Sequence, residues 1–430
     1  MSYNMRMRYQ PLPPKFHASR RAALAKAIGD DAIAIIDTAD TLYRGWDAEL
    51  PFRPDPNFYY LTGIDQPEAV LVLVPGHANA KARELLFIKP TDEFIATWMG
   101  EGHTQEEAAT LSGISSVYWT TDLEPFLNRL LGQFRVVYLN ADESSSSQSS
   151  PPRRRAARLH DQAPLHQFRS AVPIVGQLRT VKEPVEIDQI RRAVEVTGAG
   201  LRRAWSVLEP GLPEYALEAE LAAEYLRQGS NGHSFQPIVA SGPRGTVIHY
   251  MANDATIDPE DLVLFDTGAE VGWYAADISR VIPASGTFTG RRRAVYEAVL
   301  RTQRAAFPLH KPGASVLSID EFMRRRLADE LAGLGLITNK QAEAKDFERH
   351  LRPFYAHISH HLGLDTHDTG DQRLKFKPGM VVTCEPGLYL KEQGIGVRLE
   401  DDILITDGEP EILSRDIPSE PAELERLIGK

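Results

Sequence analysis

The chain has 430 residues and a formal net charge of −11. This length predicts two domains, because a single hydrophobic core rarely extends over so many residues. An acidic chain lacks the basic face that nucleic-acid binding requires, so we expect no nucleic-acid partner, and we interpret the short basic run at 153–155 as a solvated loop.

The sequence indicates neither a secreted protein nor a membrane protein. Its single cysteine, Cys384, excludes an intrachain disulfide, which fits a reducing compartment. Residues 1–21 lack the apolar segment of a signal peptide. No run approaches the ~18 apolar residues of a membrane-spanning helix. We therefore expect a cytoplasmic protein with no membrane partner.

The first part of the chain alternates helix-like and strand-like segments. A helix is expected to end at Ile28, and short apolar runs predict buried strands at 32–36, 69–74, 84–88 and 135–139. Strands spaced among helices predict an α/β layer. Residues 144–152 are rich in serine and end in two prolines, which predicts a flexible loop. We place the domain boundary near Ile174, which gives domains of 1–173 and 174–430.

The second part begins with two expected helices, one from Glu183 and one over 213–227. A strand at 262–265 then delivers Asp266 at its end, and a second strand at 274–282 carries Asp277. Antiparallel pairing of these strands can bring both carboxylates to one point. Aspartates beside glycine also cap turns, so this pair alone is weak evidence for a site.

Two later segments carry further polar side chains in apolar settings. Residues 357–367 hold four of the 13 histidines, with small and apolar residues between them, which favours a buried polar site over a surface cluster or a subunit contact. An apolar strand at 380–385 ends in Glu385, and a buried carboxylate needs a cation or hydrogen-bond donors. Strand alternation puts Cys384 on the opposite face, so we expect it to pack in the core.

The segment 394–400 predicts a strand with Arg398 and Glu400 on one face and aliphatic residues on the other. A half-exposed strand with an ion pair would give the same pattern. His249 stands alone near a strand end, where a histidine is more often structural than catalytic. As a set, four carboxylates and one imidazole suit a two-metal site that makes hydroxide from water at neutral pH; they are Asp266, Asp277, His360, Glu385 and Glu400.

Together these segments resemble the pita-bread metallopeptidases, in the branch that contains aminopeptidase P and prolidase. The matching motifs begin at His249 and Asp266, continue through Ser359 to Asp368 and Glu385 to Tyr389, and end with Gly396 to Asp402. They occur in the family's order. Residues 52–63 and 67–73 also resemble the N-terminal domain of aminopeptidase P, which separates the chain from methionine aminopeptidases.

The resemblance implies an α/β (α+β) chain, with a smaller α/β aminopeptidase P-type domain at 1–173 and a pita-bread (creatinase/aminopeptidase) catalytic domain at 174–430. It implies two divalent ions, commonly manganese, although the oxygen-rich ligands also suit Co²⁺, Zn²⁺ or Fe²⁺. It assigns the five ligands named above. It further implies catalytic or substrate-contacting roles for His249, His357 and His367, supporting roles for Tyr389 and Arg398, and a homodimer or homotetramer.

The expected activity is hydrolysis of the N-terminal Xaa-Pro bond of peptides. That bond is a tertiary amide whose proline nitrogen has no hydrogen to donate. A hydroxide bridging two metal ions attacks without needing that donor. Glu385 is the candidate that relays the proton to the departing nitrogen, and His367 is a candidate donor to the developing oxyanion. His249 and His357 would line the proline side, and Tyr389 the substrate.

Two kinds of alternative remain. A prolidase limited to Xaa-Pro dipeptides shares the metal chemistry and differs in how the substrate's C-terminus is enclosed. The short stretch at 391–393 leaves the shape of the substrate entrance undecided between them. A pita-bread binding module without catalysis, or a creatinase-like amidinohydrolase, would not need the five ligands that this chain retains.

Overall fold

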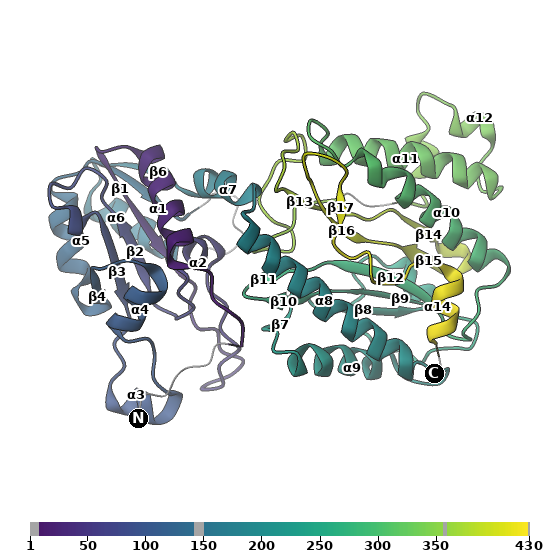
Figure 1. Cartoon of the computed structure of the whole chain (residues 1–430), viewed down its shortest axis with the longest axis horizontal. Helices are drawn as coiled ribbons and strands as arrows, with labels where there is room; N and C mark the ends of the chain where they lie inside the picture. Colours follow the sequence, from purple (N-terminus) through teal and green to yellow (C-terminus); the bar gives the residue numbers. More distant parts are fainter. Residues whose placement is uncertain (1–7, 142–149, 356–358, 429–430) are drawn as a thin grey trace. The chain divides into compact units, whose positions relative to one another are not determined.

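The computed structural model describes residues 8–141, 150–355 and 359–428. Contacts divide the chain into two compact units (Figure 1). One is Pro11–Arg179, and the other runs from Thr180 and includes the described residues before Pro11. The boundary expected after residue 173 falls inside helix α7 (Val172–Thr180), and the division into 1–173 and 174–430 stays a prediction. Among the described residues, no helix has both the length and the apolar character needed to cross a membrane.

The first unit is built on a six-stranded mixed sheet in the order β4-β3-β2-β1-β5-β6. β1 pairs antiparallel with β2 and parallel with β5, β2 pairs antiparallel with β3, and the outer strands pair parallel with their neighbours. The strands are β1 (Ala32–Asp37), β2 (Val70–Leu73), β3 (Glu84–Ile88), β4 (Val117–Trp119), β5 (Val136–Leu139) and β6 (Gln167–Ser170). The four strands expected in this part are therefore confirmed.

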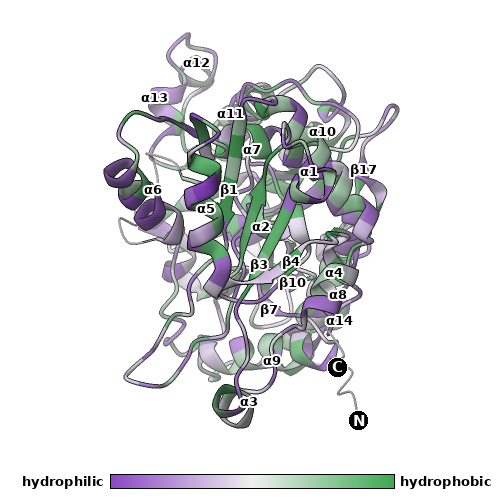
Figure 2. Cartoon of the chain, turned by 90° about the vertical axis from the view of Figure 1, so that its left-hand side faces the viewer, coloured by the Kyte–Doolittle hydropathy of each residue, from purple (hydrophilic) through white to green (hydrophobic). Residues whose placement is uncertain are grey.

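Helices surround this sheet, and its apolar core lies between the strands and α5. Ile33, Val72 and Phe87 of the strands pack with Leu127 of α5. Figure 2 shows hydrophobic residues concentrated on β1 and hydrophilic residues on the outlying helix α6. The helices are α1 (Pro14–Ile28), α2 (Pro56–Thr62), α3 (Glu93–Met99), α4 (Gln105–Ser112), α5 (Leu123–Leu131) and α6 (Pro151–Gln162), with short 3₁₀ turns η1 (Ala80–Ala82) and η2 (Thr120–Asp122).

The interpretation of 153–155 as a solvated loop is wrong. These residues lie in α6, which Pro151 and Pro152 open, because proline is tolerated at the first helical positions. Arg155 donates from Nε and Nη2 to the buried carboxylate of Asp37, at 2.5–2.8 Å. Residues 144–149 of the predicted loop lie outside the described part of the chain, and its last two residues, Pro151 and Pro152, belong to α6.

The second unit contains four small antiparallel sheets, in the orders β12-β9-β8, β13-β16-β17, β14-β15 and β11-β10-β7. In Figure 1 their strands lie between the helix pairs α8–α9 and α10–α11. The strands are β7 (Gly232–His233), β8 (Ile238–Ser241), β9 (Leu262–Thr267), β10 (Ala269–Val271), β11 (Tyr274–Ala275), β12 (Ile278–Pro283), β13 (Val381–Cys384), β14 (Gly387–Leu390), β15 (Ile395–Arg398), β16 (Asp401–Leu404) and β17 (Glu411–Ile412).

The helices of this unit cover the sheets with apolar faces. Met323 of α11 packs with Val382 and Cys384 of β13, so the expected core position of Cys384 is confirmed. The helices are α8 (Pro184–Val207), α9 (Glu214–Arg227), α10 (Gly290–Ala306), α11 (Val316–Gly333), α12 (Asn339–Ala342), α13 (Glu348–Leu351) and α14 (Pro421–Leu427), with 3₁₀ turns η3 (Gly242–Thr246), η4 (Phe307–Leu309) and η5 (Lys391–Gln393).

The strand expected over 274–282 is interrupted at Asp277, between β11 and β12. The backbone N–H of Asp277 donates to Asp402 Oδ2 at 3.2 Å, so a side chain replaces a strand partner there. Gly268 permits the close approach of this segment, since a Cβ at Gly268 would lie 1.7 Å from the Ala276 carbonyl oxygen. The Asp277 side chain is buried and belongs to the site described next.

Candidate metal centre

The five expected ligands come from separate parts of the second unit and converge on one cavity. Asp266 is near the end of β9, Asp277 lies in the interruption before β12, Glu385 follows β13, and Glu400 lies between β15 and β16. His360 lies in the segment before β13. All five line a cavity of about 490 Å³. The convergence expected from sequence is therefore present in the fold.

The side chains of Asp277, His360 and Glu400 form the tightest group. One ligand atom from each lies within 4.8 Å of the others. His360 Nε2 is 3.4 Å from Asp277 Oδ2 and 3.4 Å from Glu385 Oε1. Three carboxylates thus face one imidazole nitrogen, a donor set that hard and borderline divalent cations accept.

The orientation of the His360 ring suits metal binding. Its Nδ1 lies 3.0 Å from the carbonyl oxygen of His361, and a carbonyl can only accept a hydrogen bond. The proton of the neutral ring is therefore on Nδ1, which leaves the lone pair of Nε2 directed at the carboxylates. Metal-binding histidines commonly fix their tautomer in this way.

Ser279 joins two of the expected ligands. Its position in β12 is directly opposite Asp266 in β9. The hydroxyl lies 3.0 Å from Asp266 Oδ1 and 2.8 Å from Glu400 Oε2, and it accepts from Arg398 Nε at 2.9 Å. A hydroxyl has one proton, so it can donate to only one of the two carboxylates at a time. The carboxylate that does not receive this proton needs another partner, and a bound cation would provide one.

Arg398 also forms an ion pair with Asp266 through Nη2 and donates from Nη1 to the hydroxyl of Tyr389 at 2.9 Å. A carboxylate has about four lone-pair directions. The bonds from Arg398 and Ser279 therefore leave Asp266 able to accept a cation as well. Tyr389 is buried and its hydroxyl lies against Arg398, which fits the supporting role expected for it, and the substrate contact expected for it stays a prediction.

Thr383 fixes the other side of the group. Its hydroxyl donates to Glu385 Oε1 at 2.8 Å and accepts from the backbone N–H of His360 at 3.1 Å. Its own N–H donates to the His360 carbonyl at 2.9 Å. One strand residue therefore positions both a carboxylate and the imidazole.

The electrostatics of the group favour a bound cation. Burial, and next the charge of Asp266, raise the pKa of Asp277 well above its usual range. Burial and neighbouring carboxylates likewise raise the pKa values of Glu385 and Glu400. Asp277 Oδ1 and Glu400 Oε1 are buried without a hydrogen-bond partner among the described residues. Buried carboxylates with unpaired oxygens are costly unless a cation or protons neutralise them. The residues present therefore fit a metal.

This arrangement predicts opposite pH dependences for the metal-free and metal-loaded protein. Because the pKa values of Asp277, Glu385 and Glu400 are raised, these carboxyl groups keep their protons in the folded metal-free chain. In the unfolded chain they release them above about pH 4. The free energy of unfolding of the metal-free chain should therefore fall as pH rises from there through the raised pKa values. Metal binding displaces those protons, so the stabilisation by metal should grow with pH. Thermal unfolding with a chelator or with Mn²⁺, at about pH 5.5 and about pH 8, measures both effects.

The variant Glu400→Gln provides the control for this prediction, because it removes one of the mutually repelling carboxylates. Its metal-free form should lose less stability between the two pH values than the wild type. An identical loss in both proteins would show that the pH dependence originates elsewhere.

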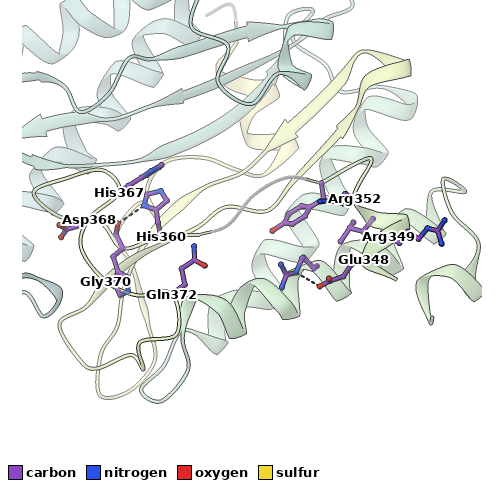
Figure 3. Close-up of a pocket in the computed structure, with 12 residues that line it drawn as sticks. Glu348, Arg349, Arg352, His360, His367, Asp368, Gly370 and Gln372 are labelled. Carbon is purple, nitrogen blue, oxygen red and sulfur yellow. Dashed lines mark hydrogen bonds and ion pairs between the residues drawn. The ribbon is translucent and has the colours of Figure 1, made fainter. Parts of the chain in front are cut away.

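Two further predicted residues line the same cavity. The His367 ring lies 4.3 Å from the His360 ring, centre to centre, and His249 contributes to the cavity wall. Burial, and then the charges of His360 and His249, lower the pKa of His367, so its ring is neutral at neutral pH. Figure 3 shows His367 beside His360. His357, the other expected substrate-contacting histidine, lies outside the described residues.

The roles of several supporting residues were not predicted from the sequence. Thr383 and Glu385 share one strand face by alternation, which is a signal for Thr383. No sequence pattern indicated a role for Lys182. Its Nζ donates to Asp368 Oδ2 at 3.0 Å, and both side chains are almost fully buried. Asp368 N–H donates to the His361 carbonyl, the same oxygen that accepts from His360. This ion pair thus anchors the loop that carries His360 and His367.

Two family models match the chain. Metallopeptidase family M24 matches residues 188–407, which hold the five candidate ligands. The N-terminal domain of aminopeptidase P matches residues 17–138, within the first unit.

Individual relatives and solved structures match over nearly the whole chain. The chain is 34% identical to a Xaa-Pro aminopeptidase of Escherichia coli (strain K12), over 95% of this chain and 96% of that one. It is 30% identical to Xaa-Pro aminopeptidase 3 of Homo sapiens, over 94% and 82%. The structure of E. coli aminopeptidase P with the inhibitor Pro-Leu superposes with a TM-score of 0.88 at 32% identity, covering 97% of this chain and 99% of that one. The chain belongs to metallopeptidase family M24.

Proposed function

We propose that this protein is a metal-dependent aminopeptidase that hydrolyses the N-terminal Xaa-Pro bond of peptides. The observation that carries the proposal is the convergence of Asp277, His360 and Glu400 in a cavity that also holds Glu385 and His367. The relatives named above bear the name Xaa-Pro aminopeptidase, and one E. coli aminopeptidase P structure is a Zn-substituted form with product. The retained ligands argue against a binding module without catalysis.

The proposed cofactors are two divalent ions held by Asp266, Asp277, His360, Glu385 and Glu400. Two such ions balance four ionised carboxylates, whereas one ion would leave an excess of buried negative charge. The oxygen-rich donor set is consistent with Mn²⁺ as the proposed metal. Bound metal would polarise the scissile carbonyl and supply hydroxide at neutral pH.

The protein's own residues would hold the substrate and move the proton. The proline nitrogen has no hydrogen, so this site needs no acceptor for one there. The departing nitrogen must gain a proton, and Glu385 on the cavity wall is positioned to carry it. The neutral ring of His367 would donate to the carbonyl oxygen as negative charge develops. Arg398 would keep Asp266 and Ser279 in place through its hydrogen bonds.

Peptide length and sequence test the proposal. The purified protein with Mn²⁺ should release the first residue of Ala-Pro-Ala, and should leave Ala-Ala-Ala largely intact. The dipeptide Ala-Pro is the comparison substrate. Cleavage of Ala-Pro alone would overturn the aminopeptidase assignment in favour of a prolidase, and equal cleavage of Ala-Ala-Ala would overturn the proline requirement.

We propose a cytoplasmic location, consistent with the single cysteine. We also propose that the chain forms a homodimer or homotetramer. Light scattering during size-exclusion chromatography measures this directly, and a monomer at micromolar concentration would contradict it.

A further inference from the structure

A second and larger cavity adjoins the metal group. Its volume is about 980 Å³, at the upper end of the ~300–1,000 Å³ range of ligand pockets. It shares His360 and His367 with the smaller cavity that holds the five candidate ligands. The two histidines thus border both spaces, and we call the larger one the distal cavity.

The distal cavity has an arginine-rich wall made by Arg324 of α11 and by Arg349 and Arg352 near α13. Figure 3 shows Arg349 and Arg352 on the side opposite His360 and His367. The side chains of Arg349 and Arg352 are exposed and make no hydrogen bond or ion pair with another described residue. No described acidic side chain is paired with either of them.

The acidic residues of the same cavity do not cancel this charge. Asp368 is already paired with the buried Lys182 at 3.0 Å. Glu348 is exposed and forms an ion pair with Arg324, with Oε1 3.4 Å from Nε, so it does not neutralise Arg349 or Arg352. The described lining therefore carries a net positive charge at the end away from the metal group.

We propose that the distal cavity binds the part of the peptide that follows proline, and that Arg349 and Arg352 select a carboxylate there. This inference rests on the proposed aminopeptidase function and names the substrate class more closely. The carboxylate could be the peptide's own C-terminus or an acidic side chain, because both present the same group to a guanidinium. Either source requires a peptide longer than the Xaa-Pro dipeptide.

Four tetrapeptides distinguish these sources. They are Ala-Pro-Ala-Ala as the free acid, the same peptide as the C-terminal amide, and the amides of Ala-Pro-Ala-Glu and Ala-Pro-Ala-Gln. The free acid is compared with its amide, and the Glu peptide is compared with the Gln peptide. Where the arginines bind the carboxylate, the charged peptide of the pair should have a kcat/KM about threefold to tenfold above that of the neutral one, mainly through a lower KM. Higher salt should reduce the difference, because these arginines are exposed.

The double variant Arg349→Gln/Arg352→Gln should lose this preference while it cleaves the neutral peptides as the wild type does. Both side chains are exposed, so the substitutions should not disturb folding. Arg326→Gln is the matched control. Arg326 lies on α11 like Arg324 but does not line the distal cavity, so its removal should leave the preference unchanged.

Equal kcat/KM for acidic and neutral peptides in the wild type would overturn the inference, and so would a preference that persists in the double variant. In both cases, cleavage of the neutral amides would leave the proposed function intact. Failure to cleave any of the four peptides in the presence of Mn²⁺ would overturn the function and the inference together.

Discussion

Replacing Glu400 with glutamine, or Asp277 with asparagine, is expected to lower cleavage of Xaa-Pro peptides by at least about a thousandfold. Each substitution removes one charged oxygen ligand from the group that lies within 4.8 Å. An amide is a weaker ligand for a divalent ion than a carboxylate, so metal content should fall with activity. Steady-state kinetics and metal analysis on the same preparations measure both.

Stability separates this loss from misfolding. In the metal-free state, Glu400→Gln should be at least as stable as the wild type, because it relieves repulsion among buried carboxylates whose pKa values are raised by burial and by one another. The exposed Glu343 is a matched control, and Glu343→Gln should keep full activity. Full activity of Glu400→Gln or Asp277→Asn at equal metal content would contradict the ligand assignment.

Replacing His367 with alanine is expected to lower kcat about a hundredfold to a thousandfold while metal content stays at the wild-type level. The ring lies 4.3 Å from the His360 ring and lines the cavity without belonging to the tight ligand group. Because its pKa is lowered by burial and by nearby histidines, the neutral ring retains an N–H donor at neutral pH. The expected loss therefore reflects a missing donor to the developing oxyanion.

The division between kcat and KM is informative for this variant. Loss of an interaction made mainly in the transition state lowers kcat with little change in KM. His77→Ala, in the first unit, controls for removal of an imidazole and should have no effect. If His367→Ala lost metal in proportion to activity, His367 would have a role in holding the metal group together, and the donor role would be wrong.

Local patterns predicted most of the fold. Apolar runs located β1, β3, β5, β9 and β13 to within two residues at either end. The helix from Glu183 was predicted because proline favours the first turn, and α8 begins at Pro184. The interruption at Asp277 could not be predicted, because its cause is a hydrogen bond to Asp402, which is distant in sequence. The position of Arg155 likewise depends on a hydrogen bond to a residue distant in sequence, Asp37.

The candidate site shows the same limit. Strand ends and alternation indicated Asp266, Glu385 and Glu400, because a carboxylate after an apolar strand must find a partner. The hydrogen bonds that support these ligands could not be predicted from the sequence. Ser279 bridges two carboxylates only because β9 and β12 pair in one register. Likewise, the hydroxyl of Tyr389 reaches Arg398 because β14 and β15 pair, and the substrate contact expected for Tyr389 stays a prediction.

Metal titration of the chelator-treated protein tests the central claim most directly. The metal-free protein should not release the first residue of Ala-Pro-Ala. Activity should rise with added Mn²⁺ and reach its plateau when two ions are bound per chain, as measured by metal analysis of the same samples. Full activity in protein shown to contain no divalent metal would contradict the account.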